Sequence, residues 1–480
     1  MNRRAADHHQ HCDGGNCERD RHPEQDAQVF ESGRWRGLLD HGALMPREAS
    51  RSQKADDAPH AVEQVKHPPR LAPDCLDTSK EEVRRRFREA RRRGRPAWLW
   101  PEVPQDQWNE ALRAIASAAG AILAGEARVR LRDENPDAVG LAGYTSGLGP
   151  LLGWWRERGQ LDVSDSVGPV LDLHLSHSRL RSRRIEAKAT EAVAGLSRNG
   201  VDVLVLKGAH TAASYFPEPA TRPASDIDLL VRRGDRDRAD ALLRALGYEQ
   251  ASDGHFESSW RLPSVAQVPR SLWLVHADDP WSIDLHSSLN GQAGGGAPEL
   301  DLDAALPSAT SDSSFMARAR VLAEPLLLHQ LAIHAGSALQ NLTMLRLVEL
   351  RLVIEQDVAS RRLKWDEFLA IGRALGSLGH VWPALKLCCD LVPGTVPDQV
   401  LRKCEAQAPT GVRRIIGSLQ PATAQRVDRT SIAEHFMWAE GVSAHLRRLA
   451  SDLVPGRSIA ELRKVYERRM WQLLRGGFSR

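Results

Sequence analysis

The stretch VDVLVLKGAHTAASYFPEPATRPASDIDLLV, residues 201–231, decides the fold of this protein. Its first six residues form a short apolar run that predicts a strand, and the segment Gly208–Tyr215 predicts a helix. After a loop, the last six residues alternate in the manner of a second strand. Because successive side chains of a strand point to opposite faces, Asp226 and Asp228 project from the same face.

The alternation of helix and strand continues on both sides of this stretch. Upstream, Ile185, Ala189, Ala192 and Leu196 form the apolar stripe of a helix that Asn199-Gly200 ends. Downstream, the segment DRDRADALLRALGY, residues 235–248, predicts a helix with an acidic first turn and Gly247 at its end. The unit therefore reads helix, strand, helix, strand, helix.

Two further strands are predicted next, LWLVHA at residues 272–277 and WSIDLHSSL at residues 281–289, with DDP as the hairpin turn between them. In the second strand Asp284 and His286 share a face. A Gly- and Pro-rich segment then marks a boundary, and beyond about residue 315 the chain reads as helices, expected over 325–336, 342–357, 366–375 and 381–391.

Asp226, Asp228 and a third carboxylate, Asp284, thus come from two strands of one small sheet. Two like charges about 4 Å apart repel by roughly 4 kcal/mol at an effective dielectric of about 20, so a proton or a cation must neutralise the cluster. Carboxylate oxygens suit Mg²⁺, and two such ions can activate an attacking hydroxyl and stabilise a leaving oxygen. The cluster predicts a site for two Mg²⁺ ions, with Mn²⁺ as the alternative.

The segments LVLKGAHTAASYF, TRPASDIDLLV, LGY and SIDLH together resemble the poorly characterised bacterial branch of the polymerase-beta-type nucleotidyltransferase superfamily. The resemblance covers about residues 90–396. It implies an α+β fold in which a small mixed-sheet nucleotidyltransferase core, residues 178–296, lies between an N-terminal helical region, 80–177, and a C-terminal helical region, 315–480. A disordered tail is expected over residues 1–79, because that segment lacks apolar periodicity.

The resemblance also implies that Asp226 and Asp228 bind metal and that Asp284 is the third ligand or the base that receives the hydroxyl proton. Charge and position suggest the remaining roles. The turn at Gly208 would offer backbone N–H groups to a triphosphate. The other expected contacts are Lys207 and Arg222 to phosphate oxygens, hydroxyl donation by Thr211 and Ser225, and a hydrogen bond from His286 to Asp284 or to the substrate.

One feature departs from the wider superfamily. Many of its members carry Gly-Ser at the phosphate-binding turn, about a dozen residues before the first aspartate. This chain has Lys207-Gly208-Ala209-His210 there, and a longer connection. Because of this difference, a second function stays open, that of a catalytically inactive binding or regulatory protein with the nucleotidyltransferase fold.

Together these features predict a metal-dependent nucleotidyltransferase that moves a nucleoside monophosphate from an NTP, ATP first, to a small molecule, peptide or protein. A net charge of +3 over 480 residues gives no strong field for nucleic acid, and no stretch approaches the roughly 18 apolar residues of a membrane helix. A cytoplasmic protein is expected.

Two further segments carry their own interpretations. The arginine-rich segment Lys80–Arg95 predicts a helix that is either a solvated lead-in or the RNA-binding part of an adaptor protein. The tail contains His8, His9, His11, Cys12, Cys17 and His22, whose spacing completes no zinc motif.

Overall fold

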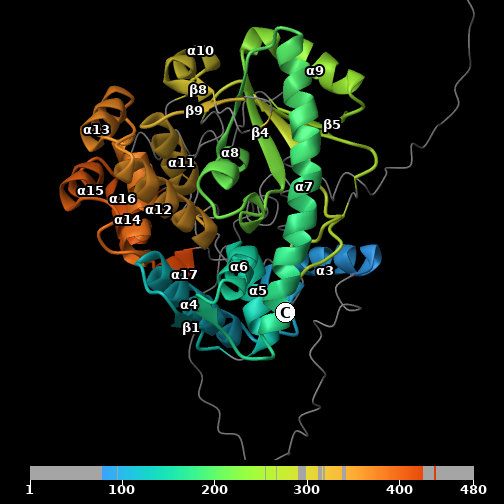
Figure 1. The fold of residues 1–480 in the computed structure, drawn as a ribbon, viewed down its shortest axis with the longest axis vertical. Helices are drawn as coiled ribbons and strands as arrows, with labels where there is room; N and C mark the ends of the chain where they lie inside the picture. The colour runs from blue at the N-terminus through green and yellow to red at the C-terminus, as the bar shows by residue number, and fades with distance from the viewer. Residues whose placement is uncertain are drawn as a thin grey trace, which may run out of the picture.

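The computed structural model describes residues 78–93, 96–133, 135–254, 256–265, 268–289, 299–311, 316, 319–337, 342–424 and 437–438. The tail predicted over residues 1–79 and its histidine and cysteine cluster lie outside the described residues, apart from positions 78 and 79. Figure 1 shows a central sheet with the long helix α7 along one side and two groups of helices around it.

A mixed sheet of seven strands has the order β5-β6-β7-β4-β3-β9-β8. Its strands are β3 (Val203–Val205), β4 (Asp226–Val231), β5 (Glu249–Asp253), β6 (Glu257–Arg261), β7 (Ser282–His286), β8 (Ala309–Ser311) and β9 (Arg320–Leu322). The pairs β4–β7 and β3–β9 are parallel, and the other neighbours are antiparallel. Between the strands run α8 (Lys207–Ser214), η3 (Pro219–Thr221), η4 (Arg233–Asp235) and α9 (Arg236–Ala245).

The N-terminal helices are α3 (Lys80–Arg93), η2 (Pro96–Leu99), α4 (Gln105–Leu123), α5 (Pro136–Ser146), α6 (Gly149–Glu157) and α7 (Gly168–Arg198), with a small parallel pair β1 (Val129–Arg130) and β2 (Leu161–Asp162). The boundary expected between residues 177 and 178 falls inside α7. This helix is continuous because buried positions recur along its length, from Val170 and Leu171 to Leu196.

The C-terminal helices are α10 (Leu302–Ala305), η6 (Leu306–Ser308), α11 (Leu326–Gly336), α12 (Met344–Ala359), α13 (Trp365–Ala374), α14 (Leu378–Leu391), α15 (Asp398–Glu405), α16 (Thr410–Gly417) and α17 (Pro421–Ala424). Each of the four helices predicted between residues 325 and 391 is present. None of the described helices combines the length and apolar character needed to cross a membrane.

The two faces of the sheet belong to different hydrophobic cores. Val203, Val205 and Ile227 pack with α7 and α9, whereas Leu204 and Leu230 pack with the core that includes α11 and α12. Asp226 and Asp228 alternate with Ile227 along β4, so they project on the same side as Leu230. The carboxylates therefore face the side of the sheet whose core is shared by the N-terminal helices α4 to α6 and the C-terminal helices.

The prediction of a strand at residues 272–277 is wrong. This segment is a buried loop, in which Leu272 and Leu274 are almost fully enclosed. Side chains supply hydrogen-bond acceptors that a neighbouring strand would otherwise provide. The Ser271 hydroxyl accepts the backbone N–H of Trp273 at 3.0 Å, and the Asp279 carboxylate accepts that of His276 at 2.8 Å. The antiparallel neighbour of β7 is instead β6. Because β6 contains several polar residues, its sequence did not indicate a strand.

The structure also corrects the expectation that the chain is helical beyond residue 315. The strand β9 follows that point, and it extends the sheet by pairing with β3 and β8. Three residues are too few to show a clear alternation in the sequence.

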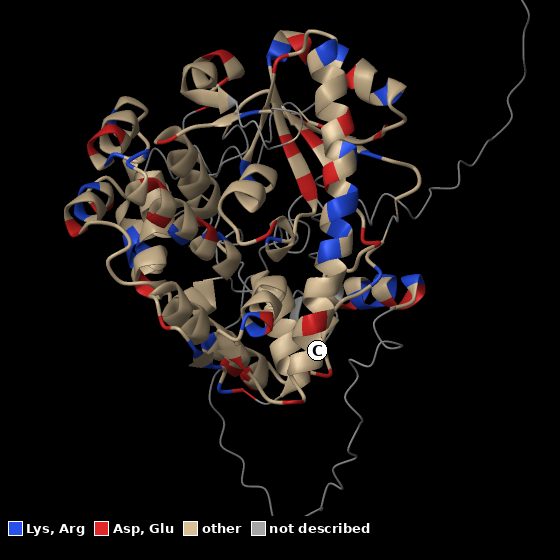
Figure 2. Ribbon diagram, in the orientation of Figure 1, with Lys and Arg blue, Asp and Glu red and all other residues tan. Residues whose placement is uncertain are grey.

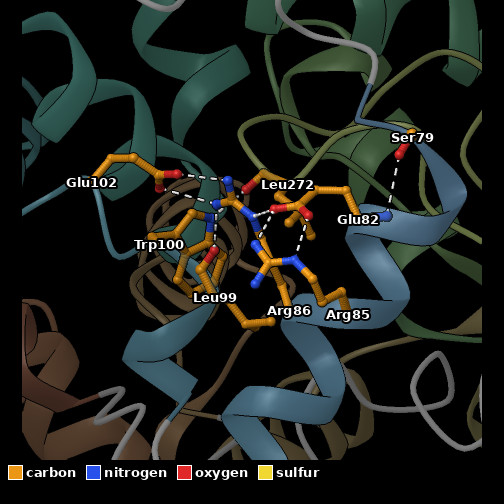
Figure 3. Close-up of polar contacts among 8 residues, drawn as sticks. All are labelled: Ser79, Glu82, Arg85, Arg86, Leu99, Trp100, Glu102 and Leu272. Carbon is orange, nitrogen blue, oxygen red and sulfur yellow. Dashed lines mark hydrogen bonds and ion pairs between the residues drawn. The ribbon is translucent and has the colours of Figure 1, made fainter.

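The arginine-rich helix α3 is a packed element rather than a solvated lead-in. Val83 and Ala90 are fully buried on its inner face. Arg86 forms a two-pronged ion pair with Glu102, with a shortest distance of 2.6 Å, and also donates to the backbone of Leu99 (Figure 3). In the same cluster Glu82 pairs with Arg86 and with Arg85. Since these two arginines are held by carboxylates, the structure offers less free positive charge here than the sequence suggests.

Candidate active site

The carboxylates of Asp226, Asp228 and Asp284 meet at the centre of the sheet. The parallel register of β4 and β7 places Asp228 directly opposite Asp284, and Asp226 lies two residues earlier on the same face. One oxygen from each side chain lies within 4.8 Å of the others. Figure 2 shows acidic segments side by side on strands of the sheet.

The three carboxyl groups differ in their surroundings. Asp284 is only 3% exposed, whereas Asp226 is partly exposed. Burial, followed by the negative charge of Asp226, raises the pKa of Asp284 well above its usual range. Burial and the charge of Asp228 also raise the pKa of Asp226. The cluster therefore favours a proton or a cation.

Asp228 behaves differently because it has two polar partners. Burial alone would raise its pKa, but Lys207 and His286 outweigh that effect and hold the pKa below its usual range. The Lys207 Nζ lies 3.2 Å from Asp228 Oδ1, and the His286 Nε2 lies 2.7 Å from the same oxygen. Asp228 is thus the ionised member of the group in this arrangement.

Of the two partners expected for His286, Asp284 or the substrate, the geometry bears only on the first. His286 contacts Asp228 and not Asp284, because Asp284 lies two positions away on its own strand and β4 runs alongside. On its other side, Nδ1 of His286 lies 3.6 Å from a carboxylate oxygen of Glu257 on β6. The ring therefore links the triad to a fourth acidic residue.

Lys207 stands at the turn between β3 and α8 with a backbone φ of +44°. Non-glycine residues rarely adopt positive φ, and they do so where the surrounding structure compensates for the strain. The turn aims its side chain at Asp228, consistent with a role at the site. Its contact among the described residues is the Asp228 carboxylate, and the expected contact with phosphate stays a prediction.

Gly208 lies directly against the guanidinium of Arg222. A Cβ atom at this position would lie 2.3 Å from Arg222 Nη1, so a larger residue would require the guanidinium to move. The sequence suggested that Gly208 leaves room for a triphosphate. In this structure the space beside it is filled by Arg222.

Arg222 and Thr211, both expected to bind phosphate, converge on a buried carboxylate from α12. Arg222 donates from Nε to Glu349 Oε1 at 2.8 Å and from Nη2 to Oε2 at 3.1 Å. The Thr211 hydroxyl donates to the same carboxylate. Ser225 is adjacent to the triad and partly exposed, and its backbone carbonyl accepts the N–H of Ser282. The structure therefore brings all the predicted residues together. Glu349, which was not predicted, lies between them.

Residues 155–393 match the model of a family described as an uncharacterised nucleotidyltransferase. This region belongs to that nucleotidyltransferase family. The matched region includes α7, the sheet with its carboxylate triad, and the helices α11 to α14. Comparisons with curated proteins and with solved structures gave no significant match.

Four residues of this nucleotidyltransferase site were missed from the sequence: Glu257, His334, Arg346 and Glu349. Three of them belong to α11 and α12, more than a hundred residues after the Asp226–Asp228 pair. His334 on α11 contacts Arg346, with its Nδ1 lying 2.5 Å from Nη1 of the arginine. The signal in the sequence was the three-residue spacing of Arg346 and Glu349, which places both on one face of α12.

The donor set of the nucleotidyltransferase site fits a hard divalent cation. All three ligand candidates are carboxylates, which Mg²⁺ prefers. Asp284 Oδ1 is buried and makes no hydrogen bond to any described residue. Buried polar atoms rarely go without a partner, so this oxygen is suited to a ligand that the protein itself does not supply.

Proposed function

We propose that this protein is a metal-dependent nucleotidyltransferase that transfers a nucleoside monophosphate from an NTP, with ATP the first candidate, to a hydroxyl group of a small molecule, peptide or protein. The observation that carries the proposal is the convergence of Asp226, Asp228 and Asp284 within 4.8 Å. Membership of the nucleotidyltransferase family supports it. The resemblance to the polymerase-beta-type superfamily points the same way.

In the proposed reaction the acceptor oxygen forms a bond to the α-phosphorus and the bond to the bridging oxygen of pyrophosphate breaks. Mg²⁺ held by the three aspartates would supply Lewis-acid stabilisation of the phosphate charge. Asp284 would be either the third ligand of the metal or the base that accepts the proton of the acceptor hydroxyl. Lys207 and His286 would hold Asp228 ionised and in position.

A second candidate is a protein that retains the fold and binds ligands without turnover. One observation favours it: Glu349 engages Nε and Nη2 of Arg222 and the hydroxyl of Thr211, two residues expected to bind phosphate. Under the first proposal these contacts must open when nucleotide binds, or the phosphates must be held by other cations.

Labelled nucleotides distinguish the two candidates. The purified protein is incubated with Mg²⁺, a metabolite and protein extract, and ATP labelled at either the α- or the γ-phosphate. Nucleotidyl transfer labels an acceptor from the α-position only, with release of pyrophosphate.

The Asp226→Asn/Asp228→Asn double variant should abolish this labelling. Asp240→Asn, which changes another little-exposed carboxyl outside the triad, should leave it intact. Transfer that survives the double variant would disprove the proposed site, and absence of α-label with all four nucleotides would favour the binding protein.

A further inference from the structure

Arg346 of α12 stands apart from the other cations of the site because no described carboxylate pairs with it. Lys207 pairs with Asp228 and Arg222 pairs with Glu349. Within the described residues, Arg346 donates from Nη1 only to His334, to Nδ1 at 2.5 Å and to the backbone carbonyl at 3.2 Å. Its Nε and Nη2 make no hydrogen bond to these residues.

The position of Arg346 follows from its neighbour Glu349. The two residues are three apart on α12 and therefore lie on one face of the helix. Glu349 is hydrogen-bonded to Thr211 within α8 and to Arg222, the residue that follows η3. Arg346 lies one turn earlier along the same face, on the side of the sheet toward which the carboxylates project.

Electrostatics agree with this placement. Burial lowers the pKa of Arg346 to about 10, and the charges of Glu349, Asp226 and Asp228 act in the opposite direction. A desolvated charge without a counterion is unfavourable. Arg346 and His334 are nevertheless partly exposed to solvent, so a ligand can reach the pair.

His334 orients the guanidinium. Because Nδ1 of His334 accepts a hydrogen bond from Arg346, the ring proton of the neutral histidine resides on Nε2. The backbone carbonyl of His334 accepts a second bond from the same Nη1 atom. One edge of the guanidinium is thus held by the end of α11, which leaves its Nε and Nη2 donors for another acceptor.

We propose that Arg346 binds the polyphosphate chain of the nucleotide, with His334 as its positioning residue. This inference rests on the proposed function, since it assigns part of the same site. An arginine offers two parallel N–H donors that match phosphate oxygens. The cation that completes the phosphate site therefore comes from the C-terminal helical region, and the contacts of Arg222 with Glu349 need not break.

The test uses the full chain and inorganic tripolyphosphate with Mg²⁺, measured by isothermal titration calorimetry. Arg346→Gln should weaken binding about 10- to 100-fold, as expected for loss of a charge-assisted hydrogen bond. Arg346→Lys should bind with intermediate affinity, because lysine keeps the charge without the paired donors.

Arg351→Gln is the matched control. It changes an arginine of the same helix that donates to the backbone of Leu123 and pairs with Glu355, away from the triad. Its affinity should equal that of the wild type. Circular dichroism establishes that each variant is folded, and Arg346→Lys remains informative if Arg346→Gln does not fold.

The outcomes separate this inference from the proposed function. Unchanged tripolyphosphate affinity in Arg346→Gln and Arg346→Lys overturns the role of Arg346, even if nucleotide transfer is observed. Loss of affinity in these variants upholds the phosphate site, even if the wild type transfers no label. Absence of tripolyphosphate binding by the wild type also overturns the inference.

Discussion

Replacing Asp284 with Asn should stabilise the metal-free protein and remove its response to Mg²⁺. Asp284 lies within 4.8 Å of two other carboxylates and is 3% exposed. Coulomb's law assigns each pair of full charges at that distance at least about 3.5 kcal/mol of repulsion at an effective dielectric of about 20. Protonation of Asp284 relieves part of this, so the measured gain should be smaller, about 1–3 kcal/mol.

The assay is urea unfolding in EDTA and again in Mg²⁺. In EDTA the midpoint of Asp284→Asn should exceed that of the wild type. In Mg²⁺ at 100 times its dissociation constant the wild type should gain about 2.7 kcal/mol, and the variant should gain little. The control Asp240→Asn should retain the wild-type response.

The pH dependence has a definite sign. Because the pKa of folded Asp284 is raised, its contribution to stability is present at low pH and is lost as pH rises through the folded value. The advantage of Asp284→Asn over the wild type should therefore grow with pH. A variant that is less stable than the wild type in EDTA and still responds to Mg²⁺ would refute this reasoning.

Two further predictions concern stability. Glu349→Gln should reduce the free energy of unfolding by about 3–5 kcal/mol, because it leaves Arg222 buried without a counter-charge. The exposed control Glu355→Gln should reduce it by under about 1 kcal/mol. Equal losses for the two variants in urea unfolding would contradict the argument. Burial lowers the pKa of His174 and His329 to about 4, so stability should fall as pH drops from about 6.5 toward 4. His329→Gln should reduce that fall between pH 7 and 5, and an unchanged fall would exclude this histidine as a cause.

Local patterns were sufficient to predict the elements that carry the aspartates. The alternation in β4 placed Asp226 and Asp228 on one face because the side-chain period of a strand is two wherever the strand lies. The helices α8 and α9 and the four helices between residues 325 and 391 follow from apolar spacing and end signals in the same way. The strand β7, with Asp284 and His286 on one face, was also readable from the sequence.

Local sequence patterns thus indicated most of the helices, the strands β3, β4 and β7, and the faces that the side chains of these strands take. Only the tertiary structure decided which strand lies beside which, because pairing and register depend on contacts between distant segments. It placed Asp228 opposite Asp284, turned residues 272–277 into a buried loop, and brought Glu349 to Arg222 across 127 residues. The faces of the three carboxylates are therefore local properties of β4 and β7, whereas their convergence depends on strand pairing and the placement of Glu349 and Arg346 depends on how α12 packs.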